Sequence, residues 1–120
     1  MLTYDNLSQE AQTELPNFKT KYDQLIEDDV IDTESGKHIV FGYAFTPALS
    51  EAITNKDEET AKKMFLFLEK MASSEDNRVV EVCDQSVLEE LNDEFDENTL
   101  KRYMRANTAE GYKALKQYMR

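Results

Sequence analysis

The chain of 120 residues is poor in the residues that cross-link or interrupt a backbone: it contains one cysteine, two prolines, three glycines and no tryptophan. The single cysteine, Cys83, has no partner for an internal disulfide, which is typical of a reducing compartment. Few glycines and prolines exclude a flexible linker or a low-complexity protein. No apolar run approaches the roughly 20 residues that span a bilayer, and the first residues lack a signal-peptide pattern. We therefore expect one cytoplasmic domain over residues 1–120.

Groups that carry catalysis are equally scarce, because Cys83 and His38 are the only residues of their types. Cys83 lies on an apolar stripe, where we expect a small buried side chain, and nucleophilic catalysis needs a paired base. A structural zinc site needs four Cys or His ligands. The acidic stretches 28–36 and 92–98 lack the ligand spacing of an EF-hand loop. We therefore predict a protein that is not an enzyme and has no metal or cofactor.

Positive charge is the third shortage: 14 Lys and Arg face 25 Asp and Glu, which gives a net charge of −11. Such a chain repels phosphate backbones and anionic membranes, so we expect no direct binding of nucleic acid or membrane. Residues 1–99 hold 8 basic and 24 acidic residues, whereas residues 100–120 hold 6 basic and 1 acidic. We expect a basic partner that meets the surface of residues 1–99 rather than the C-terminal helices.

Helical periodicity, by contrast, runs through most of the chain. Apolar residues recur three and four positions apart, and Pro16 suits the first turn of a helix. Asn55 with Glu58 three residues later resembles a capping box, and Ser74 is a second candidate cap. The expected helices cover residues 7–15, 16–27, 37–54, 57–72 and 76–92, a short stretch near Leu100, and the end of the chain. The sequence thus predicts an all-α fold of about seven helices in antiparallel hairpins, HEAT-like or an irregular bundle.

Residues 37–54 are the ambiguous part of this pattern. The stretch 38–45 is rich in β-branched and aromatic residues, which favours a strand. Phe41, Phe45 and Leu49 nevertheless lie at helical spacing, and no second strand is available to pair with. We predict one helix that is disturbed near Gly42 and Pro47, with a fresh helix starting at Pro47 as the alternative.

Many acidic residues have a structural explanation at helix starts, where carboxylates cap the helix and complement its dipole. Asp28, Asp29, Asp32, Asp93 and Glu94 are poorly explained in this way, and we predict that these and the acidic residues beside them bind a partner. Alternating helices would place the 28–36 loop and the 93–97 turn at different ends, and the sequence does not decide between them. The predicted partner-binding residues are Asp28, Asp29, Asp32, Glu34, Asp93, Glu94, Asp96 and Glu97.

Residues 62–93 carry a pattern that goes beyond periodicity. An apolar helix contains Phe67-Leu68-Glu69, a Ser/Asp turn follows at 74–76, and the next helix ends in L-E-E-L at 88–91. This run resembles the central segment of a bacterial family of small helical proteins often encoded beside toxin genes. The resemblance implies an immunity protein that binds and neutralises a toxin of a polymorphic or contact-dependent growth inhibition system, with a basic nuclease as the expected kind of toxin. The motif is structural, so it assigns no functional residue.

Two other classes of protein stay open. One is a helical adaptor or regulatory module that binds a helix or peptide in a groove between hairpins. The other is a metal-binding or hydrolytic protein that uses its acidic loops. The sequence leaves the oligomeric state open as well.

Overall fold

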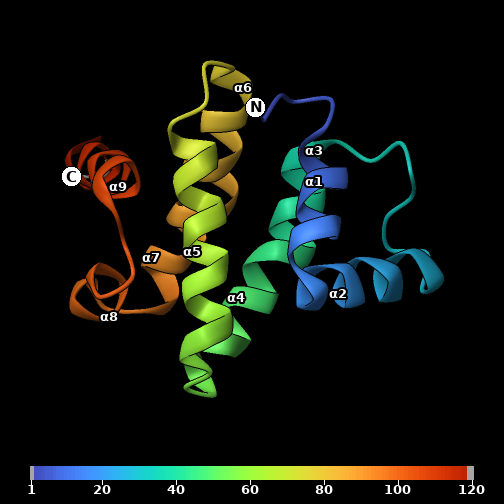
Figure 1. Cartoon of the computed structure of the whole chain (residues 1–120), viewed down its shortest axis with the longest axis horizontal. Coiled ribbons are helices and arrows are strands. Elements are labelled where there is room, and N and C mark those ends of the chain that lie inside the picture. Colours follow the sequence, from blue (N-terminus) through green and yellow to red (C-terminus); the bar gives the residue numbers. More distant parts are fainter. Residues whose placement is uncertain (1, 119–120) are drawn as a thin grey trace.

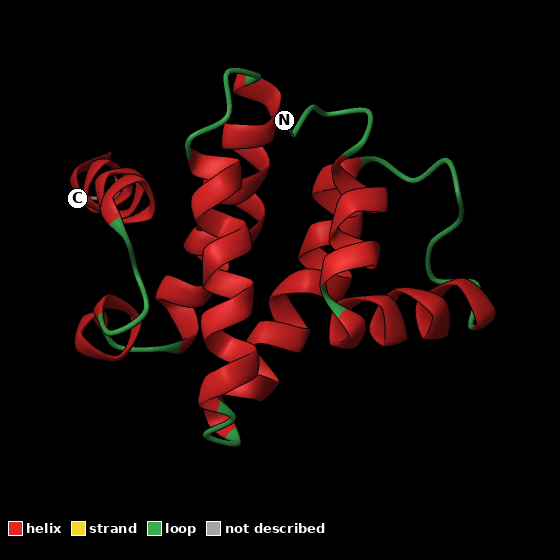
Figure 2. Cartoon of the chain, viewed as in Figure 1, coloured by secondary structure: helices red, strands yellow, loops and turns green. Residues whose placement is uncertain are grey.

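A computed structural model describes residues 2–118 of the chain; residues 1, 119 and 120, and with them the basic Arg120, lie outside this range. Within it every regular element is a helix, as Figures 1 and 2 show, and the elements join into seven continuous stretches. The predicted all-α fold of about seven helices is therefore confirmed. The elements are α1 (Leu7–Glu14), α2 (Pro16–Glu27), α3 (Lys37–Val40), η1 (Phe41–Phe45), α4 (Thr46–Thr54), α5 (Glu58–Ala72), α6 (Asn77–Glu81), η2 (Val82–Leu88), α7 (Glu89–Glu94), α8 (Glu97–Lys101) and α9 (Ala106–Tyr118).

Three long helical stretches form the centre of the molecule. Elements α3, η1 and α4 run without a break over residues 37–54, and α6, η2 and α7 do so over residues 77–94. These two stretches run in the same direction, while α5, which follows the first and precedes the second in the chain, packs against both and runs in the opposite direction (Figure 1). Two contacts fix the parallel register, since His38 lies beside Ser86 and Ser50 donates a hydrogen bond to Glu94.

The helix α5 buries most of the side chains that its spacing predicts. Six residues of this 15-residue helix are buried: Ala61, Met64, Phe65, Phe67, Leu68 and Met71. Leu66 of the same helix is 43% exposed. It lines a surface groove with Leu15 and Lys63.

The 37–54 stretch is one helix with a disturbance at the predicted position. Its η1 segment is a π-turn, in which the N–H of Thr46 bonds to the carbonyl of Phe41, five residues back. Pro47 explains this widening, because it has no N–H and its ring collides with the carbonyl four residues earlier in a regular helix. Both Phe41 and Phe45 are fully buried and stack at a ring-centroid distance of 5.2 Å. The strand-favouring composition of 38–45 therefore supplies core aromatics to a helix.

Helices α2 and α9 lie across the central stretches rather than along them. Figure 1 shows α2 running across the lower end of α1, and α9 seen almost along its axis. The buried ring of Phe18 in α2 contacts Phe41 at 5.4 Å and Phe45 at 5.9 Å between centroids. On the other side of the molecule, Tyr112 of α9 is buried and donates a hydrogen bond of 2.7 Å to Asn92. The resulting architecture is an irregular bundle.

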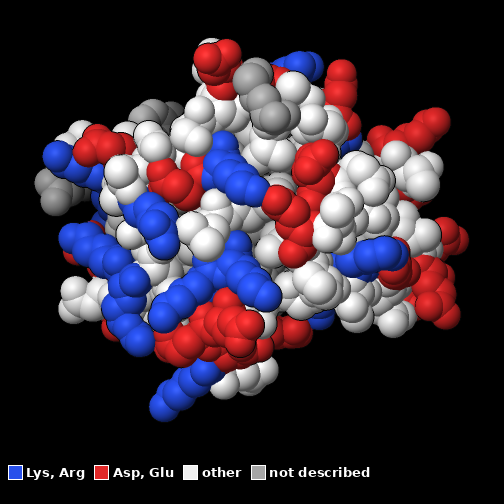
Figure 3. All heavy atoms as spheres, viewed as in Figure 1, with Lys and Arg blue, Asp and Glu red and all other residues white. Residues whose placement is uncertain are grey.

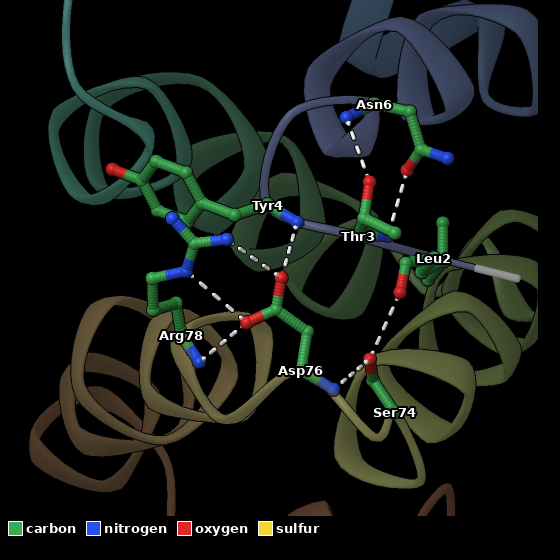
Figure 4. A network of polar contacts seen from close by, with 7 residues as sticks. All are labelled: Leu2, Thr3, Tyr4, Asn6, Ser74, Asp76 and Arg78. Carbon is green, nitrogen blue, oxygen red and sulfur yellow. Dashed lines mark hydrogen bonds and ion pairs between the residues drawn. The ribbon is translucent and has the colours of Figure 1, made fainter.

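The N-terminal segment is attached to the turn before α6 by a polar network (Figure 4). The carboxylate of Asp76 accepts the backbone N–H of Tyr4 at 2.9 Å and both side-chain and backbone N–H groups of Arg78. These hydrogen bonds, from Arg78 first and then Tyr4, lower the pKa of Asp76. Ser74 donates to the carbonyl of Leu2 at 2.9 Å, and the Arg78 guanidinium lies 4.9 Å from the Tyr4 ring centre.

The predicted caps are wrong at two helix starts. Asn55 ends α4 instead of capping α5, and the left-handed Lys56, at φ 59°, reverses the chain there. The N-cap of α5 is Asp57, whose carboxylate accepts the N–H of Thr60 at 3.3 Å. At α6 the N-cap is Asp76, and Ser74 accepts the N–H of Asp76. In both places the chain needs extra residues to close the preceding helix before the next begins.

A carboxylate from α5 caps the start of α9. Glu69 accepts hydrogen bonds from the backbone N–H and side chain of Asn107, at 3.0 and 2.6 Å. It also accepts the backbone N–H and hydroxyl of Thr108, at 3.0 and 3.1 Å. Partial burial on its own raises the pKa of Glu69, but these hydrogen bonds together outweigh it, so the pKa is lowered. An anion at a helix N-terminus satisfies donors that have no partner inside the helix.

We expect Glu69→Gln to lower the free energy of unfolding at neutral pH by about 1 kcal/mol, the usual contribution of an N-terminal cap. Because the folded-state pKa of Glu69 is lowered, its carboxylate stabilises the fold above the unfolded pKa, and this is lost as pH falls through the folded pKa. Urea denaturation across the acidic range should show the two proteins converging. The control Glu110→Gln, exposed on α9, should leave stability nearly unchanged. A constant difference at every pH would contradict this role.

Candidate protein-binding surface

The eight acidic residues predicted to bind a partner are all exposed, and they form two separate clusters. The first, here the 28–34 cluster, lies on the loop between α2 and α3, at the right of Figure 1. The second, the 93–97 cluster, lies where α7 passes into α8, at the lower left. The 28–34 cluster contains Asp28, Asp29, Asp32 and Glu34, and the 93–97 cluster contains Asp93, Glu94, Asp96 and Glu97.

Two members of the 28–34 cluster shape their own loop. Asp29 adopts the left-handed conformation at φ 62° that ends α2, and the next N–H, of Val30, bonds to the carbonyl of Leu25 at 3.0 Å. Asp is one of the few residues besides glycine that tolerates this conformation. Asp32 accepts the N–H of Glu34 at 2.8 Å and so tightens the turn. Part of this acidity therefore has a local structural cause that the sequence did not reveal.

The 93–97 cluster is also tied to its surroundings. Glu94 accepts the hydroxyl of Ser50, which links α7 to α4. Asp96 caps α8 by accepting the N–H of Thr99 at 2.8 Å, and hydrogen bonds from Thr99 lower the pKa of Asp96. Glu97 lies 3.5 Å from the ammonium of Lys101. These contacts hold the exposed carboxylates in defined positions.

A surface groove lies where the two π-turns, η1 and η2, come together, and our sequence analysis did not predict it. The groove has a volume of about 340 Å³. Two large apolar side chains at its edge are exposed: Tyr43 at 56% and Ile39 at 50%. A side chain added at Gly42 would meet no atom within 4 Å, so the space above this glycine is open. The lining residues are His38, Ile39, Gly42, Tyr43, Gln85, Ser86 and Glu90.

Ser86 holds the two walls of this groove together. The Nδ1 atom of His38 lies 2.8 Å from its hydroxyl oxygen, and the buried Thr46 hydroxyl donates to its backbone carbonyl at 2.7 Å. His38 therefore links the two helical stretches through its contact with Ser86. We did not predict the π-turn at 82–88, although the apolar residues Val79, Cys83, Val87 and Leu91 repeat every four positions, a longer period than the 3.6 residues of an α-helix.

The remaining reactive groups offer little chemistry. Burial raises the pKa of the Cys83 thiol well above its ordinary value, and its sulfur lies 3.7 Å from the carbonyl oxygen of Leu68. The predicted burial of Cys83 is confirmed. Among residues 2–118 no three His, Cys, Asp or Glu side chains are grouped to hold a metal ion. No helix in the described part of the chain is long and apolar enough to cross a membrane.

Asp84 of η2 has a carboxylate oxygen that is buried without a hydrogen bond. This atom, Oδ1, has no hydrogen-bond partner among the described residues. It points at the backbone of Gly111 in α9, where an added Cβ would lie only 2.8 Å away. A side chain at position 111 would therefore require the Asp84 carboxylate to move. Burial raises the pKa of Asp84.

The fold and these surfaces define a small all-helical domain whose charged clusters and groove lie on the outside. The chain belongs to a family described as a domain of unknown function (DUF7674), whose model matches residues 8–120. Comparisons with curated proteins and with solved structures give no match.

We expect Thr46→Val to lower the free energy of unfolding by about 1–2 kcal/mol, because it leaves the buried carbonyl of Ser86 without its donor. Urea denaturation measures the change. Thr13→Val is the matched control, since the Thr13 hydroxyl bonds only to a carbonyl of its own exposed helix. Equal effects of the two substitutions would show that the Thr46–Ser86 hydrogen bond does not stabilise the fold.

The ionisation of Asp84 is expected to change the free energy of unfolding with pH in the direction opposite to that of Glu69. Because its pKa is raised in the folded chain, stability is lost as pH rises from the ordinary Asp value of about 3.9 through the folded-state pKa. Asp84→Asn removes this ionisation, so the variant should gain on the wild-type protein as pH rises. Thermal unfolding at a series of pH values measures the difference, with the exposed Asp93→Asn as control. A difference independent of pH would contradict a buried ionisable carboxyl.

Proposed function

We propose that this protein is an immunity protein: in the bacterial cytoplasm it binds a basic protein toxin and neutralises it by covering the active cleft, without catalysing a reaction. The observation that carries the proposal is the exposure of all eight predicted carboxylates, in two clusters, on a chain of net charge −11. The resemblance of residues 62–93 to proteins encoded beside toxin genes supports the same conclusion.

Charge complementarity explains how such a protein would act. A toxin that cleaves nucleic acid has a basic cleft, and exposed carboxylates occupy the positions of phosphates there. Steering by opposite charges speeds association, and charge pairs desolvated at an interface couple by ~1.5–7 kcal/mol. The fixed positions of Glu94 and Asp96 reduce the conformational entropy lost on binding.

The distribution of charge refines where a basic partner fits. Figure 3 shows Lys and Arg over the middle of α5 and on the side that holds α8 and α9, an acidic patch over the lower end of α5, and further acidic side chains at the opposite edge. Lys63, Lys70 and Arg105 line one groove beside α5 together with Glu14 and Glu69. The boundary at residue 99 therefore does not separate an acidic surface from a basic one, because Lys63 and Lys70 precede it. A basic partner is expected at the two clusters of exposed carboxylates.

The groove between the π-turns favours a second candidate function, a helical adaptor that binds an apolar segment. Its support is the exposure of Ile39 and Tyr43 beside an open hollow. Salt separates the two functions, because charge-steered association slows steeply with ionic strength while apolar docking does not.

The test uses the purified protein and the product of the adjacent reading frame. We expect a stoichiometric complex that protects cells from that product, with an association rate that falls at least about tenfold between low and physiological salt. The charge-reversal pairs Asp28→Lys with Glu34→Lys, and Asp93→Lys with Glu97→Lys, should slow association through whichever cluster faces the partner.

The matched control is Glu10→Lys with Glu110→Lys, which makes the same charge change at exposed positions outside both clusters. Rapid-mixing fluorescence measures the rates. The absence of a complex with the wild-type protein, or equal rates for all variants, would refute the proposed inhibition.

A further inference from the structure

We propose that the groove between η1 and η2, together with the 93–97 cluster, docks an amphipathic helix whose apolar side chains are flanked by Lys or Arg. This inference rests on the proposed binding function and adds to it the surface used and the kind of segment recognised. It also selects one of the two acidic clusters.

Two exposed apolar side chains lie at the edge of the groove. Ile39 and Tyr43 lie four residues apart in one helical stretch, so they stand on the same face, and both are exposed beside the open space over Gly42. Scattered exposed apolar side chains are ordinary, but two neighbours at the lip of a hollow form a place for apolar atoms of a partner. The hollow, about 340 Å³, lies near the lower end of ligand pockets, which run from roughly 300 to 1,000 Å³.

The charge around the groove determines the polarity of the partner. Glu90 is the one carboxylate among the residues that line it, and no Lys or Arg is among them. Further along the same helical stretch the exposed Asp93 and Glu94 continue the negative edge into the 93–97 cluster. The hydrogen bond from Ser50 to Glu94 shows that this cluster borders the same pair of helices as the groove. A partner that fills the groove with apolar atoms therefore needs positive charge beside them.

The walls of the groove favour a helical occupant. They are two parallel helical stretches, 37–54 and 77–94, and a helix in such a groove presents anchors three, four and seven residues apart. The described residues contain no strand, so no sheet edge is available to an extended peptide. A proline-rich segment needs a groove lined with several Phe, Tyr or Trp rings. Tyr43 is the only such residue among those that line this groove.

The groove is held in place before anything binds. Ser86 joins both walls through His38 and Thr46, at 2.8 and 2.7 Å. Because these contacts already order the π-turns, docking costs little conformational entropy in this protein. The 28–34 cluster, in contrast, lies on the loop between α2 and α3, which contributes no residue to the lining of the groove.

The probe for this inference is a synthetic peptide of about five helical turns made of leucine and lysine, with the leucines along one face. It is titrated into ¹⁵N-labelled full-length protein. We expect the largest chemical-shift changes in residues 39–43 and 85–94. Gly42→Phe should fill the groove and weaken binding at least about tenfold, the effect of losing a central interface contact. Gly36→Phe is the matched control, since a side chain at Gly36 also meets no atom within 4 Å but lies outside the lining residues.

A second variant guards against loss of folding. Tyr43→Ala removes an exposed side chain, so the fold is retained, and we expect it to weaken the peptide several-fold; circular dichroism of each variant checks the helical content. Shift changes centred on the 28–34 cluster, unchanged affinity of Tyr43→Ala, or no binding of the peptide would each overturn the inference.

The experiments distinguish a failure of the groove inference from a failure of the proposed immunity function. If the peptide docks in the groove but the product of the adjacent reading frame does not bind, the docking surface stands and the immunity function falls. If that product binds wild type, Gly42→Phe and Tyr43→Ala equally well, the immunity function stands and the groove is not its interface.

Discussion

The contact of Thr46 and His38 with Ser86 is the interaction on which the described architecture depends. Pro47 removes one N–H from the 37–54 stretch, the helix widens into a π-turn, and the 77–94 stretch widens opposite it. Ser86 bridges the two widened turns with its hydroxyl and its carbonyl. Helix α5 packs against both stretches, and the groove lies between the two widened turns.

The helices were predictable because apolar spacing is a property of each segment. Even the disturbance near Gly42 and Pro47 followed from the residues themselves. The helix caps were not predictable, because Asn55 and Asp57 both suit a helix start. The choice between them depends on how many residues are needed to end α4. The cap of α9 comes from Glu69, 38 residues away, which no local pattern indicates.

The candidate site divides in the same way. Exposure of the acidic residues was predictable from their type, since Asp and Glu side chains are rarely buried unless they are paired. The hydrogen bonds that these residues form were not predictable. The turn at Asp32 depends on backbone geometry, and the Ser50–Glu94 contact depends on a neighbour far along the chain. The groove was hidden because Ile39 and Tyr43 belong to an apolar run that otherwise reads as core.

The network around Asp76 has a consequence for biosynthesis. The N–H of Tyr4 reaches a carboxylate 72 residues later, so the segment before α1 finds this partner only after the turn before α6 has been synthesised. Contacts between such distant residues form late, because the intervening loop must be closed first. The segment before α1 is therefore among the last parts of the domain to become ordered, and in a nascent chain stalled before Asp76 it lacks this contact.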